Sequence, residues 1–284
     1  MIVLAGTVPY KTGLYIGPAD VQGHVLNVGG ISVPVERGTA AMAAACGQAC
    51  RYYGLEMPLC LLAGDVGDSR GTDLMFEELN SRLDAYDPDV VALHYMFPKL
   101  SHGGPFIEKI TSLKKKPVLI ADAGGMYLMK TISAAPLCDV FTPDKGELYF
   151  LSDEFAPHPL YVRSELLGED IPLESLAAAA YKNKNTARTT LIKGAVDTIY
   201  TDGVKVNELS QPQIPAMEAI GGTGDTITGL VAALRSRRDP EADYKSLAVN
   251  RLIGEAIVCT PATQIAAFID AIPRVLERYE KKTR

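Results

Sequence analysis

The sequence predicts a three-layer α/β/α fold with a mostly parallel central sheet. Short, continuously apolar runs of strand length, such as 59–63 and 117–121, alternate along the chain with segments that suit helices. Continuous apolar strands are typical of parallel sheets that helices cover on both faces. Ligands bind beyond the carboxyl ends of the strands in such folds, so the loops that follow the predicted strands form the candidate site.

The length fits one large α/β domain or two small ones, and the continuous alternation of strands and helices leads us to expect one domain over residues 1–284. The chain is 47% hydrophobic and 22% charged, so it can bury a sizeable core. Its net charge is -6 and it carries no basic stripe, so we do not expect nucleic acid as a partner. It shows no signal peptide and no apolar run of about 18 residues, so we expect a cytoplasmic protein that does not enter the membrane.

The N-terminal part of the chain consists of short β segments separated by glycine and proline. We expect a small sheet or flap beside the core, with the flap at 10–35. The segment after it is rich in Ala, Met and Cys and ends at Gly54, which predicts a closely packed helix. The β segments are 2–5, 13–17, 23–28 and 31–35, and the helix is 37–53.

Strands and helices then alternate in the pattern of parallel β–α units. Continuous apolar residues mark the strands, and apolar residues at helical spacing mark the helices. Prolines interrupt 153–171, which we expect to be an irregular surface excursion. The predicted strands are 59–63, 89–94, 117–121, 138–141 and 189–193, with a β-rich patch at 197–208; the predicted helices are 72–85, 105–114, 126–134, 173–184, 242–259 and 262–280, and another opens at 142–148.

Cysteine and histidine residues give no motif. The five cysteines are scattered without a CxxC pair, which is typical of reduced and mostly buried thiols. The four histidines are equally dispersed, so we expect neither a histidine-based metal site nor a Ser-His-Asp triad.

A glycine-rich segment lies directly before the apolar helical run 227–234. Its glycines let the backbone turn tightly, and the first helical turn offers unpaired N–H groups and a positive dipole end to an anion. Asp225 would repel that anion, so we interpret it as a general base that takes the proton from an attacking hydroxyl. An ordinary helix start capped by Thr223 or Asp225 explains the segment equally well. The candidate anion hole is Gly221, Gly222, Thr223 and Gly224.

Asp144 and Glu147 are candidate ligands of Mg²⁺. They lie one helical turn apart behind the predicted strand 138–141 and could hold the ion directly or through water. Capping of a helix by acidic residues is the better explanation of this pair taken alone.

Polar residues also end two predicted strands. Asp122 follows 117–121, and Lys193 with Gly194 closes 189–193, where an ammonium could meet a phosphate or the nucleotide sugar. A turn residue and a solvated lysine are the simpler alternatives.

Asn27, Gly29 and Gly30 could let the N-terminal flap bend over a substrate. An ordinary β turn is the simpler account of these three residues.

The order of these features resembles the ribokinase-like superfamily over most of the chain. Gly29 and Gly30, the helix 37–53 and the loop 64–68 look like the N-terminal parts of its kinases. The Asn-x-x-Glu motif of the superfamily, which helps to place Mg²⁺, appears as Asp144-Lys-Gly-Glu147, with Asp in place of Asn. The anion-hole motif appears as Gly222-Thr-Gly-Asp225, and the resemblance implies that Asp225 is the catalytic base.

The C-terminal half looks most like the ADP/ATP-dependent NAD(P)H-hydrate dehydratases, whereas the N-terminal half is closer to sugar kinases. The motifs of the first resemblance are 142–148, 191–194 and 221–229. Asp122 would match one aspartate of the Asp-Ala-Asp pattern of these dehydratases, whose first acid is Ile120 here. The resemblance implies a substrate role for Asp122.

The resemblance implies an enzyme that uses ATP or ADP with Mg²⁺ and acts on a hydroxyl group of a small molecule. A hydrate dehydratase is the most specific hypothesis. A kinase for a sugar, nucleoside or vitamin alcohol is the alternative, and a nucleotide-binding sensor without turnover is the second alternative. The resemblance also admits a homo-oligomer.

Overall fold

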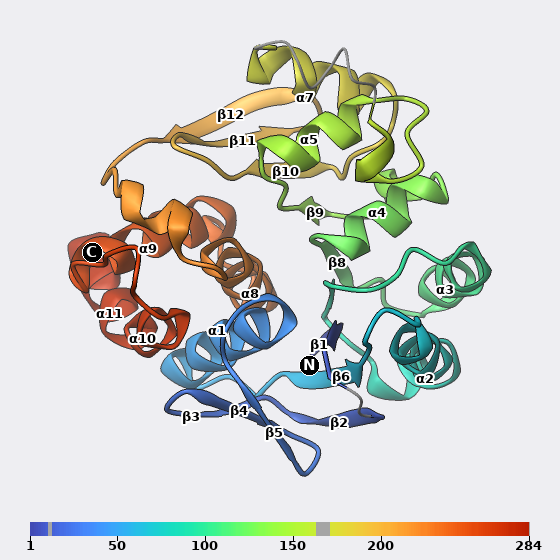
Figure 1. Ribbon diagram of the computed structural model, residues 1–284, viewed down its shortest axis with the longest axis horizontal. Coiled ribbons are helices and arrows are strands. Elements are labelled where there is room, and N and C mark those ends of the chain that lie inside the picture. Colours follow the sequence, from blue (N-terminus) through green and yellow to red (C-terminus); the bar gives the residue numbers. More distant parts are fainter. Residues whose placement is uncertain (11–12, 163–170, 284) are drawn as a thin grey trace.

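The computed structural model describes residues 1–10, 13–162 and 171–283. A nine-stranded sheet runs through the molecule in the order β12-β11-β10-β9-β8-β7-β1-β6-β2 (Figure 1). The strands from β6 to β10 in this order run parallel, and β2, β11 and β12 are antiparallel at the two edges. The strands are β1 (Ile2–Val8), β2 (Leu14–Pro18), β3 (Asp20–Gln22), β4 (Val25–Val28), β5 (Ile31–Pro34), β6 (Leu59–Gly64), β7 (Val90–Leu93), β8 (Val118–Ala121), β9 (Val140–Phe141), β10 (Thr189–Ile192), β11 (Asp197–Thr201) and β12 (Val204–Leu209).

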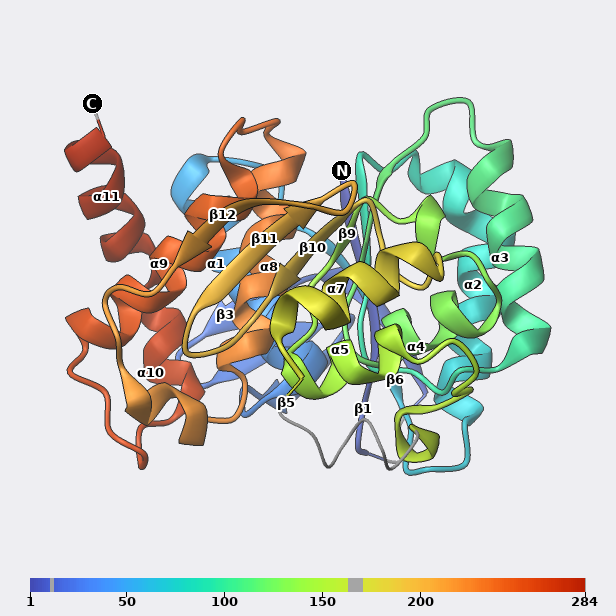
Figure 2. The same cartoon turned by 90° about the horizontal axis from the view of Figure 1, so that it is seen from above.

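Helices cover both faces of this sheet. Figure 2 shows α9, α10 and α11 on one side of it and α2 and α3 on the other. Two clusters of buried apolar side chains fill the space between the sheet and each helical layer. The predicted three-layer α/β fold is therefore confirmed. The helices are α1 (Gly38–Tyr53), α2 (Arg70–Tyr86), α3 (Leu100–Ser112), α4 (Gly124–Thr131), α5 (Lys145–Ser152), α7 (Leu173–Lys182), α8 (Thr223–Ser236), α9 (Ala242–Ala256), α10 (Ile265–Asp270) and α11 (Ile272–Thr283), with short 3-10 turns at Ala135–Leu137, Pro159–Tyr161 and Pro215–Ala219.

The N-terminal β segments divide differently from the expected flap. Strand β1 is a central strand that pairs with β6 and β7. Every one of its residues is buried, as this central position requires. Strand β2 extends the edge of the same sheet. A separate small sheet contains β3, β4 and β5, and it packs buried Val21, Leu26 and Val33 into the apolar core that also contains α1. Positions 11–12 of the expected flap lie outside the described residues.

Helices α1 and α8 pack unusually close together, as the small side chains of α1 predict. A Cβ at Gly229 of α8 would lie 2.3 Å from the backbone oxygen of Met42 and 3.0 Å from Cβ of Ala45. Glycine at this position therefore lets the two backbones touch. This contact places the first turn of α1 beside the first turn of α8, where the candidate site lies.

Two further differences concern loops and the C-terminal helix. The predicted helix 262–280 is split into α10 and α11, because Pro273 has no N–H for a continuous helix and suits the first turn of a new one. Much of the predicted excursion 153–171 lies outside the described residues. Among the described helices, none is both long enough and apolar enough to cross a membrane.

Candidate active site

The candidate site lies at the carboxyl ends of neighbouring parallel strands. His94 directly follows β7, Asp122 follows β8 and Lys193 follows β10. Strands β7, β8, β9 and β10 are adjacent in this order, so their ends bring residues that are distant in sequence to one edge of the sheet.

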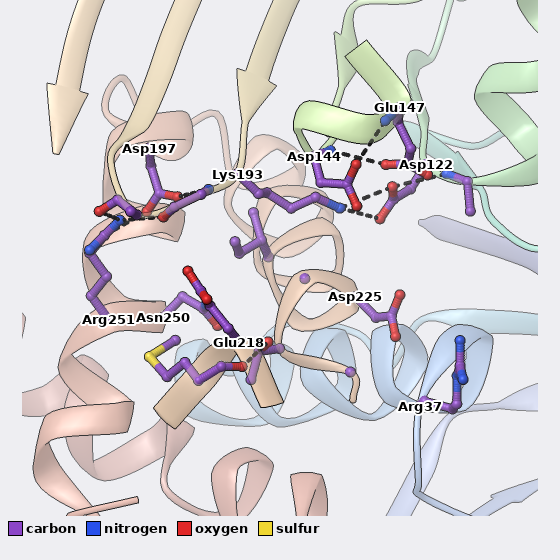
Figure 3. Close-up of a pocket in the computed structure, with 18 of the residues that line it drawn as sticks. Arg37, Asp122, Asp144, Glu147, Lys193, Asp197, Glu218, Asp225, Asn250 and Arg251 are labelled. Atoms are coloured by element: carbon purple, nitrogen blue, oxygen red, sulfur yellow. Dashed lines mark hydrogen bonds and ion pairs between the residues drawn. The ribbon is translucent and has the colours of Figure 1, made fainter. Parts of the chain in front are cut away.

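A cavity of about 520 Å³ opens between this edge and the glycine-rich segment (Figure 3). Gly221 is exposed and is not among its lining residues. Most residues that the sequence singled out do line it, and they are Asp122, Asp144, Glu147, Lys193, Gly194, Gly222, Thr223, Gly224 and Asp225.

Asp225 reaches from the first turn of α8 to the start of α1. The N-cap of α8 is Gly222, at φ 102°, and it makes no side-chain cap; the Thr223 hydroxyl donates backward to carbonyl groups of the preceding turn. Oδ2 of Asp225 accepts a hydrogen bond of 2.5 Å from the Gly38 N–H, and Oδ1 lies 3.0 Å from His94 Nε2. The interpretation of Asp225 as an ordinary helix cap is therefore wrong, and its carboxylate is held at two points.

His94 is a residue that sequence reasoning missed. Its buried ring places Nε2 3.0 Å from Asp225 Oδ1 and 3.6 Å from Asp122 Oδ2, and Nδ1 lies 3.5 Å from Thr39 Oγ1. Burial would lower the pKa of His94, but the hydrogen bonds to Asp122 and Asp225 outweigh it and raise this pKa to about 9. The ring therefore carries its second proton at neutral pH, and that positive charge is shared by two carboxylates.

Asp122 and Lys193 continue the network. Lys193 Nζ donates to both oxygens of Asp122 at 3.2 and 3.3 Å, and the Thr228 hydroxyl of α8 donates to Oδ2 at 2.6 Å. Burial would raise the pKa of Asp122, but Lys193 and then His94 hold it well below its usual value. Burial would lower the pKa of Lys193, but Asp122 and then Glu147 raise it. Both groups are charged and largely buried, so neither is a plain turn residue or a solvated lysine.

Asp144 and Glu147 form a reciprocal capping box at the start of α5. Asp144 Oδ1 accepts from the Glu147 N–H at 2.8 Å, and Glu147 Oε2 accepts from the Asp144 N–H at 3.0 Å. The structure thus shows the capping role that the pair suggests when taken alone. Both side chains also line the cavity, and burial raises the pKa of Glu147 to about 7 against the opposing effect of Lys193.

Arg251 of α9 stabilises the part of the cavity wall that contains Gly194 and Ala195. Its Nε donates to the buried Asp197 carboxylate at 2.6 Å, and its Nη2 donates to the carbonyl oxygens of Gly194 and Ala195 at 2.9 Å. Nη1 reaches the carbonyl oxygens of Ser210 and Pro212. One guanidinium therefore ties together two loops that border the cavity. No motif in the sequence pointed to this role of Arg251.

Asn27, Gly29 and Gly30 lie away from the cavity, in contrast to the expected substrate role. Asn27 Oδ1 accepts a 2.6 Å hydrogen bond from Ser32 within the small sheet. Gly29 has φ 55°, and a Cβ there would come within 2.8 Å of backbone atoms of Ile16. Gly29 therefore lets the β4–β5 turn pass close to β2, and we leave these three residues out of the proposed substrate site.

Solved structures share this fold. The structure of Arabidopsis thaliana ribokinase in complex with ribose and ATP matches with a TM-score of 0.53 and 15% identity, covering 97% of this chain and 98% of that one. At this identity the likeness shows the fold alone, and it confirms the ribokinase-like architecture.

Sequence relatives identify the family. An uncharacterized protein of Methanocaldococcus jannaschii is 37% identical over 222 residues, which cover 76% of this chain and 90% of that protein. The bifunctional NAD(P)H-hydrate repair enzyme of Pyrobaculum aerophilum is 34% identical over 176 residues, which cover 61% of this chain but 32% of that enzyme. The match thus spans about a third of that enzyme. A family model described as NAD(P)H-hydrate dehydratase matches residues 72–267, and the chain belongs to this family of enzymes.

Proposed function

We propose that this protein is a nucleotide-dependent NAD(P)H-hydrate dehydratase that works through phosphoryl transfer, with ATP or ADP as the donor. The observation that carries the proposal is the position of Asp225. Its carboxylate lies at the start of α8 beside the amides of Gly222–Gly224, where a phosphoryl group would be received, and it is kept ionised by His94. Membership of the family supports the choice of substrate.

In the proposed reaction Asp225 accepts the proton of the substrate hydroxyl as the oxygen attacks the terminal phosphorus of the nucleotide. The bond between that phosphorus and its bridging oxygen breaks, and the shortened nucleotide leaves. The amides around 222–225 stabilise the negative charge on the transferring group. The lone pair of the ring nitrogen of the hydrate then expels phosphate, and loss of a proton from the ring restores NAD(P)H.

Burial alone would raise the pKa of Asp225 and so favour its protonated form, which cannot act as a base. The hydrogen bond and the positive charge of His94 outweigh burial, and the pKa lies below its usual value. We assign His94 as the positioning residue that holds Asp225 ionised and aimed at the cavity.

The wall at Asp144 and Glu147 fits Mg²⁺. Carboxylates of Asp122, Asp144 and Glu147 line the same cavity, and the raised pKa of Glu147 shows that burial, together with these acidic neighbours, makes its ionised form costly. A divalent cation would relieve that cost and would take further oxygens from phosphate and water. When bound, the ion would neutralise charge on the nucleotide phosphates, and Asp144 and Glu147 would hold it.

A small-molecule kinase is the second candidate, because residues 1–71 lie outside the family match and yet shape the acceptor side of the site. This part supplies Arg37 to the cavity wall, and it supplies Gly38, whose N–H holds Asp225. A kinase would release the phosphate ester that the dehydratase breaks down.

The test is recovery of NADH from its hydrate. Protein, Mg²⁺, ATP or ADP and hydrated NADH should restore absorbance at the NADH wavelength. Asp225→Asn should lower kcat by about 10²–10⁴-fold, because general base catalysis is removed, while nucleotide affinity stays within about threefold. A stable phosphorylated sugar or nucleoside without NADH recovery would favour the kinase. Normal turnover by Asp225→Asn would refute the role of this residue.

A further inference from the structure

The cavity is strongly acidic, and its cations are not equally available. Among the residues that the structure describes, three cationic side chains line its wall, those of Arg37, Lys193 and Arg251. Lys193 is hydrogen-bonded to Asp122, and Arg251 is bound to Asp197 and to carbonyl oxygens. The carboxylates of the wall are those of Asp122, Asp144, Glu147, Asp197, Glu218 and Asp225.

Arg37 differs from the other two cations. Its side chain is exposed to the cavity, and its Nη2 donates to the hydroxyl of Tyr95 at 3.2 Å. Within residues 1–10, 13–162 and 171–283, no carboxylate oxygen lies within 4.0 Å of its guanidinium. A guanidinium has five N–H donors in a fixed fork, so most of its donors remain for a ligand.

The position of Arg37 assigns it to the acceptor and not to the nucleotide base. Arg37 directly precedes Gly38, whose N–H holds Asp225. The hydrogen bond to Tyr95 raises the pKa of Arg37, and the negative charge of Asp225 helps to raise it. Figure 3 shows Arg37 on the Asp225 side of the cavity, across from Asn250 and Arg251. The ring of Tyr95 lines the same side.

Among so many carboxylates, an anionic substituent of the acceptor would be repelled unless a cation without a carboxylate partner received it. We propose that Arg37 and the Tyr95 hydroxyl form a subsite for a phosphate group of the acceptor. This inference rests on the proposed function and adds to it the residues that bind this group: in a hydrated dinucleotide the subsite would receive the pyrophosphate link. Arg37 would contribute bidentate hydrogen bonds and charge, and Tyr95 would orient the guanidinium.

The kinetic test compares two acceptors that differ in phosphate alone. Hydrated reduced nicotinamide mononucleotide carries a phosphate group, and hydrated reduced nicotinamide riboside does not. Arg37→Met should raise KM for the mononucleotide hydrate by about 10–100-fold and leave KM for the riboside hydrate within about twofold. Tyr95→Phe should show the same selectivity with a smaller effect. The control is Arg188→Met, which removes an exposed arginine that pairs with Asp202 outside the cavity. Equal losses with both acceptors would overturn the subsite and place Arg37 in phosphoryl transfer.

A binding test separates this inference from the proposed function, because it needs no turnover. With the nucleotide subsite filled by Mg²⁺ and a non-hydrolysable ATP analogue, inorganic pyrophosphate is titrated by calorimetry. The native chain and Arg188→Met should bind it, and Arg37→Met should bind it at least about tenfold more weakly. Equal binding by all three proteins, or no binding by the native chain, would overturn the subsite. Pyrophosphate binding that depends on Arg37 without any NADH recovery would keep the subsite and refute the dehydratase.

Discussion

The proton on the buried His94 ring affects the ionisation of the carboxylates around it. The groups that face the ring are Asp225 from α8, Asp122 after β8, Thr39 from α1 and the Tyr95 ring, with Lys193 behind Asp122. The two carboxylates stabilise the protonated ring. In turn, the ring keeps Asp225 ionised despite its burial, so His94 and Asp225 depend on each other.

His94→Gln should therefore change the pH dependence of activity. Without the positive charge, the pKa of Asp225 would rise, so the acid limb of kcat/KM would move to higher pH, and kcat at pH 7 would fall by about 10–100-fold. The native enzyme should lose activity as pH rises through about 9, where the His94 proton leaves, and the variant should lack that alkaline limb. The measurement is a pH profile of NADH recovery.

The control is His102→Gln, which breaks another His–Asp pair, with Asp73, outside the cavity. Its profile should match that of the native enzyme. An unchanged profile for His94→Gln would contradict the positioning role. An NMR titration of the His94 ring gives an answer that is independent of activity: the proton should remain until pH 9. Since the unfolded pKa is about 6.5, the stability that this proton contributes is complete below pH 6.5 and is lost as pH rises through 9.

At the scale of elements, the Arg251–Asp197 pair connects α9 to the loops after β10 and β12. Both side chains are buried, with 6% and 8% of their surfaces exposed. Removing one partner of such a pair leaves a buried charge uncompensated, which costs far more than loss of a surface ion pair.

Arg251→Met should lower the free energy of unfolding by about 3–5 kcal/mol and raise the nucleotide KM, because the cavity wall at Gly194 and Ala195 loses its anchor. Urea unfolding measures the first effect. The matched control is Arg235→Met, which breaks the partly exposed pair with Asp243 and should cost less than about 1 kcal/mol. The double variant Arg251→Met/Asp197→Asn should recover part of the loss. If the single variant lost no more than the control, the anchoring role would be contradicted.

The sequence predicted elements well where the pattern is local. The helix 37–53 and the end at Gly54 are confirmed, because small residues and a left-handed glycine act within one segment. The role of β1 was not predictable from the four apolar residues 2–5, since neighbouring strands decide whether a short run is central or at an edge. The break between α10 and α11 was missed although Pro273 marks it.

At the scale of the whole molecule, the alternation of strands and helices predicted the fold. The fold in turn predicted that the loops after the parallel strands lie together at one edge of the sheet. It did not identify the partners within the site. His94, Arg37 and Arg251 lie in segments without a motif, and their roles arise from contacts over long sequence separations, such as His94 with Asp225. Asp225 and the glycines were found because a phosphate cradle requires their types in close sequence, and Lys193 was found because it ends a predicted strand.

Nucleotide binding should stabilise the whole molecule, because a ligand that binds only the folded state adds its binding free energy. With Mg²⁺ and nucleotide at about 100 times Kd, the gain is about 2.7 kcal/mol, which raises Tm by about 5 °C for a chain of this size. Thermal unfolding with ATP, ADP and AMP measures this and identifies the preferred donor. Asp225→Asn should keep the shift, whereas Glu147→Gln should lose its dependence on Mg²⁺, since Gln preserves the capping box but not the charge. No shift with ATP or ADP at millimolar concentration would contradict nucleotide binding, because the cradle at α8 would then hold no phosphate.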